Sequence, residues 1–339
     1  MRIKSKSPNS PKHRIGHSNQ YMKQRAPRNQ TITCSKQEIT TFSKQLVRLS
    51  GPARLQDISN RIICQDLFAC ASFLPADFVD LLVLDPPYNL TKTFGGRVFK
   101  AREAKAYMAW FARVLDALDP VLKRSASIYV CSDWRTSNLV FPLLEQRYIV
   151  RNRITWERDK GRGAKGNWKN NTEDIWFCTR GKDYCFNVDA VKLKRRVLAP
   201  YRDREGEPKG WRAGSGGNFR LTHPSNIWND ITIPFWSMPE NTDHPAQKPE
   251  KLMAKLILAS SMPGDFVLDP FAGSGTAAVA ARKLGRRFAG IERCLEYCCL
   301  AVKRLALAQS DTSIQGYADG VFWERNSLRL QRKDGKGER

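Results

Sequence analysis

Short apolar runs that each end on an acidic residue constrain the fold of this chain more than any other feature. The run at residues 81–84 ends on Asp85, the run at 266–268 ends on Asp269, and the run at 288–291 ends on Glu292. Runs of this length are typical of strands that are buried on both faces of a sheet. Ligands bind at the carboxyl ends of such strands, so these acids are expected at one crevice.

Helical periodicity alternates with these runs. Tyr107, Phe111, Leu115 and Leu118 recur at helical spacing, and Pro249 suits the first turn of another helix. Further helices are expected at residues 276–284 and from 292 to about 308, and further strands at 61–66, 127–131, 148–156 and 174–178. The alternation predicts a doubly wound α/β fold, with a mixed but mostly parallel sheet and helices on both faces.

Three segments fall outside this alternation. Residues 1–58 are basic and lack apolar periodicity, so a disordered arm with weak affinity for phosphates is expected. Residues 183–240 are rich in Arg, Lys, Trp and Gly and are expected to form an insertion outside the sheet. Residues 311–339 are expected to form a polar tail. The insertion thus divides the α/β domain into residues 59–182 and 241–310.

The charge of the chain favours a polyanionic partner. It has 57 Lys and Arg residues against 33 Asp and Glu residues, a formal net charge of +24. Each cation that neutralises a phosphate releases condensed counterions, which favours nucleic acid. No secretory signal, basic amphipathic helix or membrane-spanning run is found, so no membrane partner is expected.

The nine cysteines are scattered along the chain and include no Cys-x-x-Cys pair. Cys294, Cys298 and Cys299 lie in a helical pattern, which favours buried thiols over metal ligands. No metal site and no disulfides are therefore expected, and a reducing cytoplasm fits this cysteine usage.

The tetrapeptide Asp85-Pro86-Pro87-Tyr88 directly follows one predicted strand. The two prolines fix the backbone and remove two N–H donors, which leaves carbonyl acceptors beside a carboxylate. Such a site accepts hydrogen bonds from an amino group, and the tyrosine offers a flat face for stacking. These groups suit an aromatic amine as substrate, although a rigid turn after the strand is the structural alternative.

A glycine turn follows the strand at residues 266–269. Gly273 and Gly275 let a ligand approach the backbone closely, and the helix that follows favours negative charge at its start. Glu292 ends the next strand, where an acid typically binds ribose hydroxyls. The pattern indicates a nucleoside cofactor. Ala278 replaces the third glycine of the dinucleotide fingerprint, a replacement which that pattern tolerates, so a nicotinamide enzyme remains an alternative.

Together the two motifs resemble the beta class of DNA amino-methyltransferases, in which the Asp-Pro-Pro-Tyr half precedes the Phe-x-Gly-x-Gly half. The resemblance covers roughly residues 60–310, and it includes the linker at residues 244–249. It implies a Rossmann-like methyltransferase sheet and S-adenosylmethionine as cofactor. Members often carry a Trp-Asp pair soon after the tetrapeptide, and this chain has Thr91–Gly96 there instead. The residues that form the wall of the base pocket are therefore not identified by the resemblance.

The resemblance also implies site residues. The catalytic tetrapeptide is matched by Asp85, Pro86, Pro87 and Tyr88. Cofactor-binding positions are matched by Asp66, Lys248, Asp269, Phe271, Gly273, Gly275, Thr276 and Glu292, with Glu292 at the ribose and Lys248 near the methionine moiety.

The expected reaction is direct methyl transfer to an exocyclic amine of a base flipped out of duplex DNA. Asp85 and the Pro86 carbonyl would accept the two N–H bonds, and Tyr88 would stack on the base. An aspartate at the first position of the tetrapeptide is usual for adenine enzymes of the class, which favours N6 of adenine. No Pro-Cys dipeptide is present, so the ring-carbon cytosine reaction is set aside.

DNA contacts are expected from the insertion, as the target-recognition segment, and from a mobile basic loop near residue 160. The candidate residues are Arg158, Lys160, Arg162, Lys165, Arg195, Arg196, Arg202 and Arg212. A basic solvated loop with core tryptophans is the alternative for the insertion.

The sequence alone leaves several alternatives open. The chain could be an N4-cytosine methyltransferase, an RNA or protein amino-methyltransferase, or a DNA-binding module with a dead catalytic site. A homodimer is expected from the resemblance alone. A cognate restriction endonuclease would be a partner if the enzyme serves restriction-modification rather than acting alone.

Overall fold

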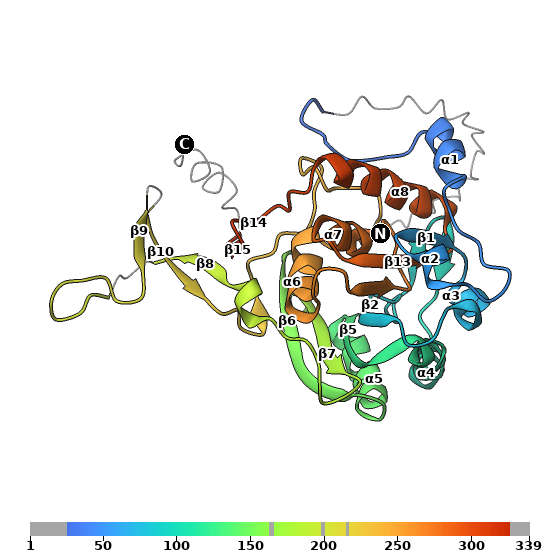
Figure 1. Cartoon of the computed structure of the whole chain (residues 1–339), viewed down its shortest axis with the longest axis horizontal. Helices are drawn as coiled ribbons and strands as arrows, with labels where there is room; N and C mark the ends of the chain where they lie inside the picture. Colours follow the sequence, from blue (N-terminus) through green and yellow to red (C-terminus); the bar gives the residue numbers. More distant parts are fainter. Residues whose placement is uncertain (1–25, 163–165, 198–200, 215–216, 326–339) are drawn as a thin grey trace, which may run out of the picture.

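The main body of the protein is an eight-stranded sheet in the order β1-β13-β12-β2-β5-β7-β6-β11 (Figure 1). The computed structural model describes residues 26–162, 166–197, 201–214 and 217–325. The strands of this sheet are β1 (Arg61–Cys64), β2 (Val79–Leu84), β5 (Leu122–Ser132), β6 (Ile149–Arg162), β7 (Asn170–Thr179), β11 (Ile227–Trp228), β12 (Phe266–Asp269) and β13 (Arg287–Glu292). Of these strands, only β7 runs antiparallel to both of its neighbours, so the predicted mixed, mostly parallel sheet is confirmed.

Helices cover both faces of this sheet. On one face lie α4 (Ala104–Leu118) and α5 (Trp134–Glu145), and on the other lie α6 (Glu250–Ser260), α7 (Thr276–Lys283) and α8 (Leu295–Ser310). Strand β2 shows why. Leu82 and Leu84 belong to the core under α4 and α5, and Leu81 and Val83 belong to the core under α6, α7 and α8. Each such fully buried side chain contributes about 1.5–3 kcal/mol, which explains the uninterrupted apolar run. Helix α5 is not predicted from the sequence, because Pro142 lies inside it.

The N-terminal segment contradicts the expected disorder. Residues 26–58 include α1 (Lys36–Ser43) and α2 (Leu55–Ile58), so the predicted disordered arm over 1–58 is wrong for this part. Ser35 and Glu38 form a capping box at the start of α1, and Lys303 of α8 donates to Glu38 Oε1 at 2.6 Å. The prediction of disorder followed the basic composition of the segment and overlooked these local signals. Residues 1–25 lie outside the described residues.

The insertion and residues 317–323 together form a second sheet beside the first, in the order β14-β15-β8-β10-β9. Its strands are β8 (Leu193–Arg196), β9 (Arg212–Gly214), β10 (Gly217–Thr222), β14 (Tyr317–Ala318) and β15 (Val321–Trp323). In Figure 1 it projects to one side of the main sheet. One part of the insertion departs from the expectation, because β11 pairs with β6 and extends the main sheet.

The C-terminal segment also differs from the prediction. A polar tail is expected over 311–339, yet β14 and β15 fold into the second sheet, and Phe322 and Trp323 are buried. The apolar run at residues 321–323 supplies the burial that a solvated tail would lack. No described helix has the length and apolar character needed to cross a membrane.

Candidate active site

The tetrapeptide lies at the carboxyl end of β2, in the middle of the sheet. Both carboxylate oxygens of Asp85 accept hydrogen bonds from Lys248 Nζ at 2.7 Å. The Tyr88 hydroxyl lies 3.1 Å from Asp85 Oδ1, and Tyr107 of α4 donates to the Pro87 carbonyl at 3.0 Å. The structure therefore brings Lys248, which precedes α6, onto the tetrapeptide from a distant part of the chain.

Glu173 of β7 completes this cluster, and sequence reasoning missed it. Its Oε2 lies 2.8 Å from the Tyr88 hydroxyl and 3.4 Å from Lys248 Nζ. Its Oε1 accepts a hydrogen bond from Arg158 Nη1 of β6 at 3.0 Å. The signal that could have found it is a glutamate at the start of a buried strand pattern, where a charge needs a partner.

The cluster contains two carboxylates and two cations, so its formal charges cancel. Burial raises the pKa of Asp85, and Lys248 opposes that rise. Burial would also raise the pKa of Glu173, but Lys248 and Arg158 overcome it and hold that pKa below its usual value. For Lys248 burial would lower the pKa, yet the two carboxylates raise it. Lys248 is therefore charged at neutral pH.

The glycine turn lies between β12 and α7. Gly273 and Gly275 have φ angles of +51° and +76°, in the left-handed region that favours glycine. A Cβ atom at Gly273 would lie 2.9 Å from His244 Nε2. The Gly273 N–H donates to Glu292 Oε2 at 3.0 Å, and the Cys294 N–H donates to the other oxygen at 2.8 Å. These bonds fix the Glu292 carboxylate at the end of β13.

Asp269 ends β12 beside this turn, and its side chain is unusual. It is only 4% exposed, and its Oδ1 accepts one hydrogen bond, from the Phe271 N–H at 3.1 Å. Among the residues that the structure describes, no cation lies within ion-pair distance of this carboxylate. Burial raises its pKa to about 8. Asp269 is thus a buried acid without a cation of its own.

The other expected cofactor residues lie around the same edge. Asp66 follows β1, whose Cys64 pairs with Glu292, and its carboxylate accepts a hydrogen bond from the Phe68 N–H at 3.0 Å. The ring of Phe271 lies 6.1 Å from that of Trp110. The Thr276 hydroxyl accepts a hydrogen bond from Arg304 at 2.9 Å, so this side chain helps to join α7 to α8.

A small hairpin occupies the place where the expected Trp-Asp pair is missing. Its strands are β3 (Lys92–Phe94) and β4 (Arg97–Phe99). Lys92 Nζ donates to the Pro245 carbonyl at 3.2 Å, and the Gly95 N–H donates to the Tyr297 hydroxyl at 3.0 Å. The hairpin thus links the tetrapeptide half to the cofactor half, across the linker and the start of α8.

The structure places the expected DNA-binding residues in two separate parts, β6 and the insertion. Arg158, Lys160 and Arg162 belong to β6, so the predicted mobile loop is wrong for them, and Arg158 binds Glu173 within the site. The continuous ladder with β7 explains this, because the strand pairing extends to Arg162. Lys165 lies outside the described residues.

The remaining four DNA candidates lie in the insertion. Arg195 Nε pairs with Glu324 Oε1 at 3.2 Å, and the Arg196 N–H donates to the same side chain at 3.0 Å. The Arg202 guanidinium lies 5.2 Å from the Trp211 ring, and Arg212 is exposed on β9. Trp211 itself is buried, as the alternative of core tryptophans predicts.

The sheet order, with acids and a glycine turn at adjacent strand ends, defines a Rossmann-like methyltransferase. A family model described as DNA methylase matches residues 79–303. DNA adenine methyltransferase YhdJ of Escherichia coli (strain K12) is 35% identical over 266 residues, which cover 76% of this chain and 86% of that protein. The chain therefore belongs to the DNA methylase family, and the resemblance drawn from its motifs is confirmed.

A second relative supports this membership, and a solved structure shares the fold. Type II methyltransferase M.HpaI of Haemophilus parainfluenzae is 31% identical over 251 residues, which cover 73% of this chain and 74% of that protein. The solved structure of PvuII DNA methyltransferase (cytosine-N4-specific) has a TM-score of 0.55 at 17% identity, and it covers 72% of this chain and 85% of that one. At this identity the second likeness concerns the fold alone.

Proposed function

We propose that this protein transfers a methyl group from S-adenosylmethionine to N6 of an adenine in double-stranded DNA. The observation that carries the proposal is the position of Asp85, a carboxylate at the end of β2 with Pro-Pro-Tyr behind it. Its neighbouring strand β12 leads into the glycine turn. Membership of the DNA methylase family and the 35% identity to a protein named DNA adenine methyltransferase support the choice of substrate.

The residues at the glycine turn fit S-adenosylmethionine. This cofactor carries a positive sulfonium, an α-ammonium and ribose hydroxyls, and when bound it supplies an activated methyl group. Asp269 is a buried carboxylate without a cation, and Glu292 is a fixed acid at the strand end, suited to ribose hydroxyls. The left-handed Gly273 keeps the backbone open where a side chain would collide with His244.

The tetrapeptide would orient the amine. Asp85 and the carbonyl of Pro86 accept its two N–H bonds, which directs the nitrogen lone pair out of the base plane. Tyr88 stacks on the base, which must leave the duplex to reach this depth. Because no covalent bond to the protein is required, positioning and electrostatics supply most of the rate.

The second sheet is our candidate for target recognition. Arg195, Arg196 and Arg212 lie on its strands, and arginines can contact phosphates or guanine edges. A homodimer and a cognate restriction endonuclease are partners that we propose from the family alone, since no contact within the chain bears on them.

The test uses purified protein, unmethylated genomic DNA and S-adenosylmethionine, with single-molecule sequencing to identify modified bases. The wild type should place N6-methyladenine in one short sequence motif, and Asp85→Ala should place none. N4-methylcytosine in the wild-type sample would instead assign the cytosine reaction. A wild type that binds the cofactor and leaves DNA unmodified would overturn the proposal and direct attention to RNA and protein amines.

A further inference from the structure

The carboxylate of Glu173 holds two groups that also contact Asp85. The Tyr88 hydroxyl is within hydrogen-bond distance of both acids, and Lys248 Nζ lies 2.7 Å from Asp85 and 3.4 Å from Glu173. A small swing of the lysine would therefore exchange one carboxylate for the other. No residue of the Asp-Pro-Pro-Tyr motif provides this second acceptor.

Such an exchange meets a need of the proposed reaction. In the structure both oxygens of Asp85 are occupied by one ammonium. An incoming amine must donate its N–H to the same carboxylate, and a full positive charge beside that carboxylate weakens its ability to draw the proton. Retaining Lys248 near Asp85 would also place a cation against the amine. The lysine needs another anion close by, because an unpaired buried charge is costly.

We propose that Glu173 is a positioning residue that retains the Tyr88 hydroxyl and receives the Lys248 ammonium when the target amine binds to Asp85. The inference rests on the proposed function and adds a named residue to it. No covalent step is involved, and the net charge of the cluster does not change.

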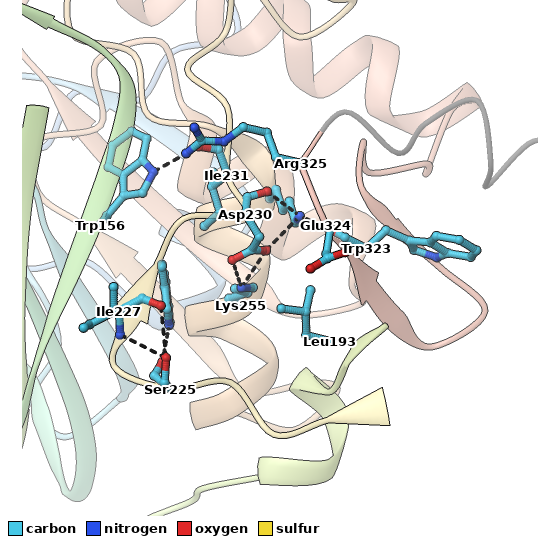
Figure 2. A network of polar contacts seen from close by, with 12 residues as sticks. Trp156, Leu193, Ser225, Ile227, Asp230, Ile231, Lys255, Trp323, Glu324 and Arg325 are labelled. Carbon is cyan, nitrogen blue, oxygen red and sulfur yellow. Dashed lines mark hydrogen bonds and ion pairs between the residues drawn. The ribbon is translucent and has the colours of Figure 1, made fainter. Parts of the chain in front are cut away.

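The surroundings of Glu173 hold it rigidly in this place. Arg158 fixes its second oxygen at 3.0 Å, and the ladder between β6 and β7 sets Trp156 directly opposite Glu173. Trp156 Nε1 donates to the Ile231 carbonyl at 3.2 Å (Figure 2), and Arg325 donates to the carbonyl of Glu157 at 2.8 Å. The C-terminal segment thus contacts and stabilises β6, the strand that carries Arg158.

The first test is Glu173→Gln, which keeps the shape of the side chain and removes its charge. We expect kcat for DNA methylation to fall about 10- to 100-fold, by analogy with the outer-shell partners that orient metal ligands. The KM values for cofactor and DNA should stay within about twofold, since Glu173 contacts neither in the proposal. Glu157→Gln is the matched control on β6, because adjacent strand residues point to opposite faces. Its kcat should match the wild type.

A charge-balance variant separates positioning from simple neutralisation of Arg158. In Glu173→Gln the guanidinium of Arg158 loses its partner, and in Glu173→Gln/Arg158→Gln the formal charges cancel again. Our inference expects kcat of the double variant to remain low, since Lys248 still lacks its second carboxylate. Recovery of the double variant to wild-type kcat would overturn the inference, and so would an unchanged kcat in Glu173→Gln.

The pH profile gives a readout that a structural role would not move. The groups that face Glu173 are Tyr88 and Asp85 after β2, Arg158 on β6, Lys248 before α6 and Cys131 on β5. Repulsion from Glu173 raises the pKa of Asp85, after the larger effect of burial. The acid limb of kcat should therefore shift to lower pH in Glu173→Gln. An unshifted limb would contradict the inference.

The proposed function and this inference can fail separately. A wild-type protein that binds S-adenosylmethionine and does not modify DNA removes the proposed function. An active wild type whose Glu173→Gln variant has normal kcat removes the inference alone. Thermal unfolding of each variant identifies any that fails to fold, and Glu173→Asp then serves as the second variant. That variant keeps the charge and should retain more activity than Glu173→Gln.

Discussion

Asp85 and Asp269 occupy equivalent places on neighbouring strands, and yet their surroundings differ. Both lie at the carboxyl end of a buried strand, and burial raises the pKa of both. Asp85 has Lys248 at 2.7 Å, whereas Asp269 has one backbone N–H bond and a pKa of about 8. One carboxylate therefore carries its own cation, and the other is largely protonated at neutral pH until a cation arrives.

In the function that we propose, this difference separates two tasks at one edge of the sheet. A carboxylate that must accept an N–H bond from a neutral amine needs to be ionised before the amine arrives, and Lys248 favours the ionised form of Asp85. A carboxylate that recognises a cationic cofactor gains by having no cation of its own, because the ligand then supplies the missing charge. The difference between the two carboxylates should be measurable in three ways, and the largest expected effect concerns Lys248.

Lys248→Met should make Asp85 resemble Asp269. The change keeps the length of the side chain and removes the charge that opposes the effect of burial, so the pKa of Asp85 should rise further. We expect kcat to fall about 100-fold, comparable to the loss of one preorganised electrostatic contact. The acid limb of the pH profile should move to higher pH. Cofactor titration is the control, and normal kcat at pH 7 would contradict the comparison.

Asp269→Asn should weaken the binding of the cofactor rather than slow the methyl transfer. We expect the dissociation constant for S-adenosylmethionine to rise about tenfold, which corresponds to loss of one charge-assisted hydrogen bond. Cofactor affinity of the wild type should increase with pH up to about 8, as Asp269 ionises. Calorimetric titration at several pH values would measure both effects. Equal pH dependence in the wild type and the variant would show that Asp269 does not face the cofactor's cation.

The smallest effect concerns stability without cofactor. Asp269 has a raised pKa in the folded state, so its stabilising contribution is complete below its unfolded pKa and is lost as pH rises towards about 8. Between pH 6 and 7 the wild type should lose up to about 1.4 kcal/mol more than Asp269→Asn. Urea unfolding of both proteins at the two pH values gives this difference. Parallel losses in the two proteins would contradict the assignment of Asp269 as a buried acid.

The acids at the strand ends were predictable because local sequence determines them. A buried strand needs an apolar run, and a glycine with positive φ marks the turn that follows, so β2, β12, β13 and the turn at Gly273 could be placed. The pairing of Lys248 with Asp85 could not be derived from spacing, since these residues are joined only through the sheet order. Glu173 was missed for the same reason, because its partners come from three other segments.

The two ends of the chain were missed for a different reason. Basic and polar composition predicted disorder for residues 26–58, although the Ser35 and Glu38 capping box was visible in the sequence. Residues 317–323 form strands only because β8 of the insertion provides an edge for β15. Composition describes how a segment would behave alone, and neither segment is alone in the folded protein.

The order of strands in the main sheet has a consequence for synthesis of the chain. β2 lies between β5, which follows it closely, and β12, which belongs to the last third of the sequence. While the ribosome is still making the first two thirds of the chain, one edge of β2 is open, because β12 has not yet been made. Such an edge is exposed to mispairing, and pairing over so long a separation is slow. The nascent polypeptide therefore has no assembled crevice until β12 and β13 have been made.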